Sequence, residues 1–223
     1  MIGERAVDTM VLLDGDLPSV VALAAIREEM EVHRREARPG SGTSGRVAVC
    51  GIPWNGPLGG LFYSAIRRLA EVDGLPIIDA AMPDFCNSTS PGLRESTGLL
   101  ACAHAAAAAG YSRVVWPITA GAGEGVDIDR AAAIMDRALL CGRLVAIDAS
   151  SHGRPGIHIE TPYADLSDKQ VADLALDMAV PLEGCWWWSD RETGTDAGAE
   201  LARARWMPRL MEMGYVARQP AKA

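Results

Sequence analysis

The chain of 223 residues carries 21 Lys and Arg against 29 Asp and Glu, a net charge of −8, and 49% of its residues are hydrophobic. This composition supports a sizeable core and excludes global disorder. The acidic balance argues against a broad face that grips nucleic acid. No linker rich in Pro, Gly and Ser divides the chain, so we expect a single domain over residues 1–223.

In chain order, the hydrophobic pattern predicts strand 10–13, helix 19–36, a Gly/Ser loop at 39–45, strand 47–50, helix 62–72, strand 76–80, helix 95–109, strand 113–118, helix 129–140, strands 144–148 and 157–160, and helix 166–179. Ser19 and Ser167 suit helix starts, and Gly110 suits a helix end. Strands rich in Val, Ile and Leu that alternate with helices are typical of βαβ units. The sequence therefore predicts an α/β fold with a doubly wound, mostly parallel sheet.

The cysteines and the lengths of the apolar segments indicate where in the cell the protein resides. The five cysteines are scattered, odd in number and never at CxxC spacing, which indicates free thiols rather than a disulfide framework. The first ten residues are too polar for a signal peptide, and no window reaches the ~18–20 apolar residues of a membrane span. We expect a cytoplasmic protein that binds neither membrane nor nucleic acid.

The segment Asp14–Ser19, directly after the first predicted strand, is the first candidate site. Ligands of open parallel sheets bind beyond the carboxyl ends of the strands. Gly15 and Ser19 suit a phosphate loop, which needs small residues and backbone N–H groups at a helix N-terminus. Asp14 and Asp16 do not, because two carboxylates repel a triphosphate unless a metal bridges them.

Residues 11–19 resemble the start of the 7-cyano-7-deazaguanine synthases (ExsB/QueC-like proteins), whose strand is followed by the ATP-holding loop Ser-Gly-Gly-x-Asp-Ser. The chain keeps Gly15, Leu17 and Ser19 and departs at Asp14, Asp16 and Pro18. Residues 161–171 resemble the family's Thr-Pro-Leu…Leu-Thr-Lys-Ala-Glu-Ile segment, and residues 179–182 resemble its Gly-Val-Pro. The resemblance runs from residue 11 to about residue 215. It implies an adenine nucleotide α-hydrolase-like, Rossmann-like fold with a helical C-terminal extension.

Residues 182–223 resemble the zinc-binding segment of that family after loss of its ligands. Cys185 stands where the first zinc cysteine would, and the other three positions read Thr193, Asp196 and Ala199. A structural zinc site needs four thiolate or imidazole ligands, so we expect no zinc and no other metal here. We expect the neighbouring Trp186–Trp188 to replace the metal by burial rather than to stack on a base.

Two further motifs complete the expected pocket. Pro91–Arg94 loosely resembles the family's Pro-x-Arg-Asn motif, and Asp127 matches the aspartate of its Tyr-Pro-Asp-Cys motif. The expected ligand-binding residues are therefore Gly15, Ser19, Arg94 and Asp127. Gly15 and Ser19 would donate from backbone and hydroxyl, Arg94 would offer a planar donor fork to an anionic group, and Asp127 would accept. No residue is assigned a catalytic role.

In the resembled family, ATP activates a carboxylate by adenylation, and ammonia is then introduced to build a nitrile. Asp14, Asp16 and Asp168, which replaces the family's Lys, all oppose that chemistry. The resemblance thus implies a diverged relative from the queuosine and deazapurine pathway family, a pseudoenzyme that binds a purine- or nucleotide-like ligand without the ATP-dependent step.

Two alternatives to this function stay open. One is an active ATP-dependent synthase or ligase in which Asp14 and Asp16 hold magnesium. The other is a non-catalytic dimeric scaffold or regulatory partner. Because members of the resembled family are often dimeric, we expect a homodimer, with the Trp-rich C-terminal segment as one candidate interface.

Three other features each have two interpretations. His152 and His158 would approach each other if residues 144–148 and 157–160 formed a hairpin. Of the two interpretations, a metal site and a turn with surface histidines, we favour the turn. His104 is interpreted as a core or interface histidine. The glycine-rich segment Gly121–Gly125 suits either a close backbone approach to a ligand or a lid without one.

Overall fold

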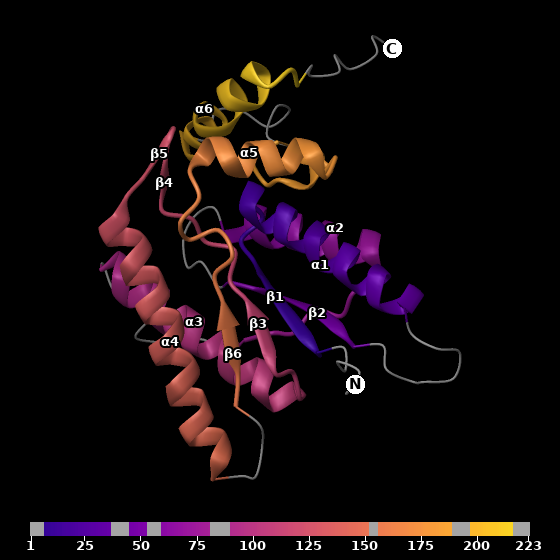
Figure 1. Ribbon diagram of the computed structural model, residues 1–223, viewed down its shortest axis with the longest axis vertical. Helices are drawn as coiled ribbons and strands as arrows, with labels where there is room; N and C mark the ends of the chain where they lie inside the picture. Colours follow the sequence, from indigo (N-terminus) through magenta and orange to yellow (C-terminus); the bar gives the residue numbers. More distant parts are fainter. Residues whose placement is uncertain are drawn as a thin grey trace.

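The computed structural model describes residues 7–36, 45–52, 59–80, 90–151, 156–188 and 197–215. Four parallel strands form its central sheet in the order β2-β1-β3-β6 (Figure 1). They are β1 (Thr9–Leu13), β2 (Val47–Gly51), β3 (Arg113–Val115) and β6 (His158–Glu160). The predicted parallel α/β sheet is confirmed, and each named strand falls inside or within one residue of a predicted one.

Strand β1 lies at the centre of the sheet and is buried along its whole length. Its register aligns Val11 with Val49 of β2 on one side and with Val115 of β3 on the other. Successive side chains of a strand point to opposite faces. Val11 and Leu13 therefore join one buried cluster, while Met10 and Leu12 join another.

Helices cover both faces of the sheet, as expected for a doubly wound fold (Figure 1). Helices α1 (Leu17–Glu36), α2 (Gly59–Asp73) and α5 (Asp168–Asp177) contribute to the cluster around Leu13. Helices α3 (Pro91–Ala109) and α4 (Ile128–Ser150) pack on the opposite face. None of the helices in the described ranges is long and apolar enough to cross a membrane.

Three further elements lie outside the central sheet. A β-hairpin of β4 (Gly121–Ala122) and β5 (Gly125–Val126) precedes α4, the 3-10 turn η2 (Leu182–Gly184) follows α5, and α6 (Ala197–Glu212) lies across α5. Figure 1 places α5, α6 and the hairpin together at the top of the molecule, beyond one end of the strands. The predicted helical C-terminal extension is present.

Two strand predictions are wrong. Residues 144–148 belong to α4, because Val145 and Ala149 continue the buried face that includes Ala138 and Cys141. The helical spacing of this face decides over the local run of β-forming residues. Residues 76–80 form no strand, and only Ile77 makes a single parallel bridge to Val49.

Other boundaries also differ from prediction. Helix α3 begins at Pro91, four residues before the predicted start, in keeping with the preference of proline for the first helical position. The hairpin that would join His152 to His158 does not exist, since residues 144–148 are helical. His152 and most of the predicted loop 39–45 lie outside the described residues. Gly121–Gly125 forms the β4–β5 hairpin.

Candidate functional site

The loop between β1 and α1 lies at the carboxyl edge of the sheet, where the fold directs ligands. The polar groups of this loop form hydrogen bonds with one another. The Asp14 N–H donates to the Ser19 Oγ at 3.1 Å, and the Ser19 hydroxyl donates back to the Asp14 carboxylate. The same Asp14 oxygen accepts the Asp16 N–H at 2.9 Å. Ser19 is 1% exposed, so its hydroxyl is used inside the loop.

Asp16 is held by tryptophans from the far end of the chain. Its Oδ1 accepts the indole N–H of Trp187 at 2.7 Å and that of Trp206 at 2.8 Å. It also accepts the N–H of Leu17, the first residue of α1. The N-terminus of a helix favours an anion. Here the carboxylate of the chain itself occupies that position.

The Asp16 carboxyl is desolvated, and desolvation disfavours the charged form. Burial, followed by repulsion from Asp14, raises the pKa of Asp16 from its usual 3.8 to about 6. Hydrogen bonds from Leu17 and Trp187 and the charge of Arg205 act in the opposite direction. This carboxyl group therefore titrates nearer neutrality than an ordinary aspartate.

The raised pKa of Asp16 predicts a pH dependence of stability. Between the unfolded value of 3.8 and the folded value of about 6, the folded chain binds more protons, so the free energy of unfolding falls as pH rises. We expect the contribution of Asp16 to fall by about 1 kcal/mol between pH 5 and 7.5. Urea unfolding of the wild type and Asp16→Asn at both pH values measures it. An equal pH dependence in the two proteins would contradict the assignment.

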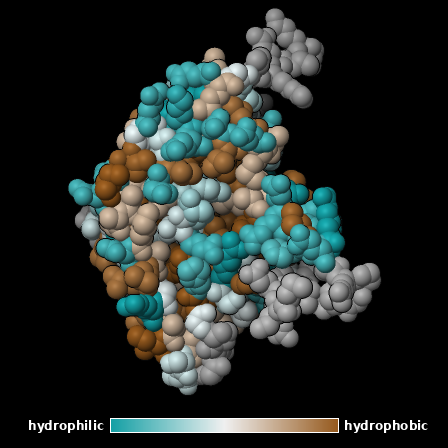
Figure 2. Space-filling view, viewed as in Figure 1, coloured by the Kyte–Doolittle hydropathy of each residue, from teal (hydrophilic) through white to brown (hydrophobic). Residues whose placement is uncertain are grey.

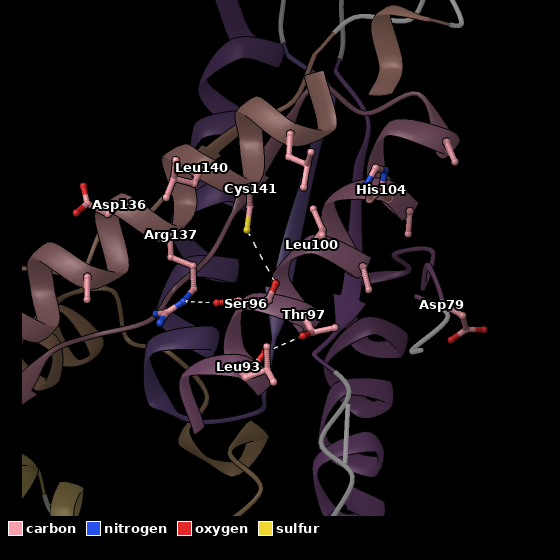
Figure 3. Close-up of a pocket in the computed structure, with 15 residues that line it drawn as sticks. Asp79, Leu93, Ser96, Thr97, Leu100, His104, Asp136, Arg137, Leu140 and Cys141 are labelled. Carbon is pink, nitrogen blue, oxygen red and sulfur yellow. Dashed lines mark hydrogen bonds between the residues drawn. The ribbon is translucent and has the colours of Figure 1, made fainter. Parts of the chain in front are cut away.

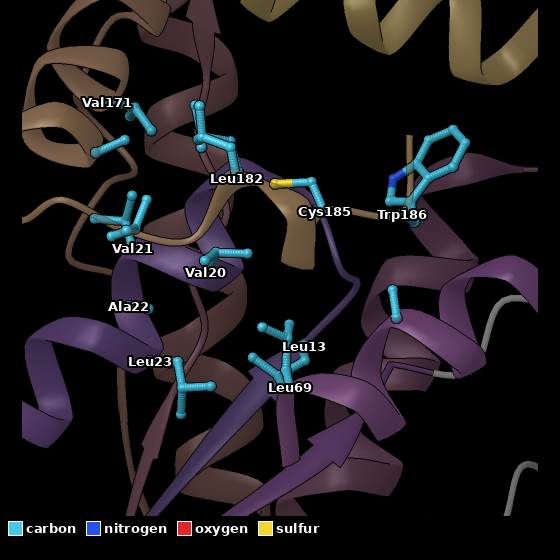
Figure 4. Close-up of a cluster of buried hydrophobic side chains, with 14 of the residues drawn as sticks. Leu13, Val20, Val21, Ala22, Leu23, Leu69, Val171, Leu182, Cys185 and Trp186 are labelled. Carbon is cyan, nitrogen blue, oxygen red and sulfur yellow. The ribbon is translucent and has the colours of Figure 1, made fainter. Parts of the chain in front are cut away.

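The segment after η2 covers the β1–α1 loop. The Trp186 N–H donates to the Gly15 carbonyl at 2.9 Å, and the Trp186 ring stacks edge-on against Phe62 with centroids 4.6 Å apart. Gly15 has φ +75°, and a Cβ added there would lie 3.2 Å from the Ala65 Cβ. Figure 4 shows Cys185 next to Leu182, in the same buried cluster as Leu13 of β1 and Leu69 of α2. Glycine is thus required at position 15 by its backbone angle and by close packing.

A second carboxylate joins α6 to the β4–β5 hairpin. Asp168 is 3% exposed and accepts Arg205 at 2.6 Å and the Gly123 N–H at 3.1 Å. The Arg205 guanidinium also lies 4.4 Å from the ring centroid of Trp206, the residue that binds Asp16. Arg205 and Trp206 therefore tie α6 to two acidic side chains at the same edge of the sheet.

The structure places the four expected pocket residues in two groups. Gly15 and Ser19 lie together in the closed β1–α1 loop. Arg94 lies in the first turn of α3, and Asp127 caps α4 by accepting the Arg130 N–H at 3.0 Å. The ends of α3 and α4 are adjacent, since Glu95 and Arg130 form an ion pair at 3.2 Å. No described contact joins the first group to the second.

Among the four expected pocket residues, Arg94 differs from Gly15, Ser19 and Asp127 in the hydrogen bonding of its side chain. Its Nε atom is buried and has no hydrogen-bond acceptor among the residues that the structure describes. A buried donor without a partner costs free energy and is normally satisfied. The neighbouring helix N-terminus adds a positive end to the same place. Arg94 therefore offers a donor to an anionic or carbonyl group beside α3.

The residues of the β1–α1 loop do not fit ATP with magnesium. The Ser19 hydroxyl and Asp14 carboxylate are paired with each other, and Asp16 fills the helix N-terminus. The C-terminal segment that resembles a zinc site is described only in part. Cys185 is fully buried, and desolvation followed by the charges of Asp16 and Asp14 raises the pKa of its thiol. Ala199 is buried in α6, and Thr193 and Asp196 lie outside the described residues.

Sequence reasoning missed the role of Trp206, Arg205 and Asp168 at this edge. Trp186 and Trp187 are buried at 6% and 0% exposure, as the burial interpretation of the tryptophan run requires. Two tryptophans donate to the carboxylate of Asp16, and no local sequence pattern predicts these hydrogen bonds. In the sequence, Asp168 was notable only because it replaces a lysine of the resembled family's motif. His104 is partly exposed on α3, 3.4 Å from Asp148 of α4.

The sheet topology defines a Rossmann-like α/β protein, and the polar side chains of its β1–α1 loop are hydrogen-bonded to one another and to the C-terminal tryptophans. No family model matches the chain, and no curated protein matches it. Among solved structures, it is similar to the U34-tRNA thiolase NcsA from Methanococcus maripaludis with its 4Fe-4S cluster, at 10% sequence identity and a TM-score of 0.47, over 99% of this chain and 77% of that chain. Likeness at this level does not extend to activity, so the fold class rests on the sheet topology above.

Proposed function

We propose that the chain binds a purine- or nucleotide-like ligand through an anionic or carbonyl group at the carboxyl edge of its sheet, next to the N-terminus of α3. The observation that carries this proposal is the buried Nε of Arg94, which has no acceptor among the described residues. Guanidinium groups recognise planar anions with paired donors. Asp127, at the adjacent end of α4, supplies an acceptor within the same region.

The proposal includes the absence of an ATP-dependent step at the β1–α1 loop. Asp16 stands where a phosphate would lie, and Trp186 and Trp206 cover the loop. Displacing Asp16 would leave two indole N–H groups without their acceptor, at a cost of about 1–3 kcal/mol each. The loop thus supports the fold of this chain, and Gly15 and Ser19 act by holding the edge in shape.

The substrate class follows from the resemblance of the sequence to deazaguanine synthases, which makes 7-deazaguanine bases, nucleosides and nucleotides the first compounds to test. We expect a thermal shift with an anionic member of this series. Arg94→Met, which keeps the length of the side chain and removes its donors, should weaken binding about 10-fold or more, since a charge-assisted hydrogen bond contributes about 1.5–3 kcal/mol. Calorimetric titration measures the ratio.

The matched control is Arg35→Met, at the exposed end of α1, which should bind as the wild type does. Other outcomes decide between the alternatives. Binding and turnover of ATP with magnesium would establish an active synthase or ligase and overturn the proposal. Equal affinity of Arg94→Met and wild type would remove the proposed site. A chain that binds none of these compounds at millimolar concentration would favour the scaffold.

A further inference from the structure

Helix α4 presents an apolar face to solvent. Five large hydrophobic side chains on its outer side are at least 43% exposed, and Leu140 and Ile147 reach 64% and 66%: Met135, Leu139, Leu140, Leu144 and Ile147. In Figure 2, brown side chains gather on the lower left of the molecule, where Figure 1 places α4. Contiguous apolar surface of this kind marks an interaction site on a water-soluble domain.

A groove runs between this face and α3. It has a volume of about 1090 Å³. Apolar residues of both helices line it, among them Leu93, Leu100, Ala101, Leu140 and Leu144. Figure 3 shows Leu100 and Leu140 at the groove, with the Arg137–Ser96 hydrogen bond of 2.8 Å crossing between the two helices. The helices that form the groove are therefore fixed to each other, and the groove is a preformed surface.

The charges on the exposed face of α4 have a self-complementary order. Asp136 and Arg143 lie seven residues, or about two helical turns, apart, with Leu139 and Leu140 midway between them. Both charged residues are exposed, and neither forms an ion pair with a residue that the structure describes. Asp136 lies near the N-terminal end of the apolar stretch, and Arg143 lies between Leu140 and Leu144.

We propose that this face pairs with α4 of a second copy of the chain, in antiparallel orientation about a two-fold axis between Leu139 and Leu140. That axis brings Asp136 opposite the partner's Arg143, and Arg143 opposite the partner's Asp136. It also brings Met135 opposite the partner's Leu144. A parallel pair would place Asp136 against the partner's Asp136, which repels. A two-fold interface uses the same patch on both subunits, and this order of charges suits that requirement.

The inference stands apart from the proposed function, because the face lies on the outer side of α3 and α4 and includes none of the expected pocket residues. It also places the dimer interface on α4 rather than on the Trp-rich C-terminal segment. Trp186 and Trp187, the earlier candidates, are buried within their own chain and are not open to a partner.

Sedimentation equilibrium of the full chain tests the proposal. We expect a dimer at micromolar concentration. Asp136→Arg alone and Arg143→Asp alone each place like charges opposite one another and should raise the dimer dissociation constant at least 10-fold. The double variant Asp136→Arg/Arg143→Asp restores complementary pairs and should recover wild-type dimerisation. Asp173→Arg, exposed on α5, is the matched control and should leave the dimer unchanged.

Circular dichroism of every variant verifies that the helices are retained. A wild-type chain that stays monomeric at 100 times this concentration would overturn the proposal, whether or not the groove then takes up a detergent or another apolar molecule. A dimer that is indifferent to both single variants would overturn it as well. A dimer that the double variant fails to restore would contradict the antiparallel arrangement.

Discussion

Asp16→Ala is expected to lower the free energy of unfolding by about 4 kcal/mol. The substitution removes the acceptor shared by Trp187, Trp206 and the Leu17 N–H. Each buried indole N–H left without a partner costs about 1–3 kcal/mol, and loss of a helix cap costs about 1 kcal/mol more. Both tryptophans are fully buried, so their N–H groups depend on an acceptor at this position. Urea unfolding followed by tryptophan fluorescence at pH 7.5 measures the change.

Asp16→Asn is the matched control for that experiment. All three donors converge on Oδ1, and an amide oxygen can accept them in the same place. The substitution also removes a desolvated charge. We therefore expect Asp16→Asn to lie within about 1 kcal/mol of the wild type at pH 7.5. If alanine were tolerated as well as asparagine, the carboxylate would not be what orders the two tryptophans.

The parallel sheet could be predicted because its signals are local. Strand β1 is a compact apolar run stopped by Asp14 and Gly15, and β2 repeats that pattern. The errors came where two local signals compete. Residues 144–148 are rich in β-forming side chains, yet their burial continues a helical face that begins two turns earlier in α4. Tertiary packing decides such a segment, and propensity alone cannot.

The site was only half predictable for a different reason. Asp14 and Asp16 could be recognised from sequence as unsuitable for a triphosphate, because that argument needs only their charges and their place after a strand. What Asp16 does instead depends on Trp187 and Trp206, which are 171 and 190 residues away along the chain. No periodicity or spacing connects residues so distant. Arg94 was chosen by resemblance, and only the three-dimensional structure shows that its buried Nε lacks an acceptor within the described part of the chain.

The C-terminal segment is therefore joined to the sheet by two acidic residues, and their loss should have comparable consequences. Asp16 receives Trp187 and Trp206, while Asp168 receives Arg205. Arg205 and Trp206 are adjacent in α6, so the two connections share one helix turn. Indole and guanidinium donors supply both connections.

Asp168→Ala is accordingly expected to lower the free energy of unfolding by about 2–3 kcal/mol. Asp168 is buried but its partner Arg205 is 35% exposed, so water solvates the guanidinium in part and the loss costs less than the about 3–5 kcal/mol of a fully buried pair. Asp168 is 3% exposed, and its loss also strips the Gly123 N–H of its acceptor and removes a negative charge from the first turn of α5. Urea unfolding measures the cost, and hydrogen exchange of the Gly123 amide should accelerate.

Lys169→Ala provides the control one residue along the same helix. Lys169 and Glu124 form a pair at 3.4 Å with side chains 51% and 79% exposed, and exposed pairs contribute less than about 1 kcal/mol. The control should leave both the unfolding free energy and the Gly123 exchange rate near wild-type values. Were Asp168→Ala to behave like Lys169→Ala, the attachment of α6 would rest on Asp16 and its tryptophans alone.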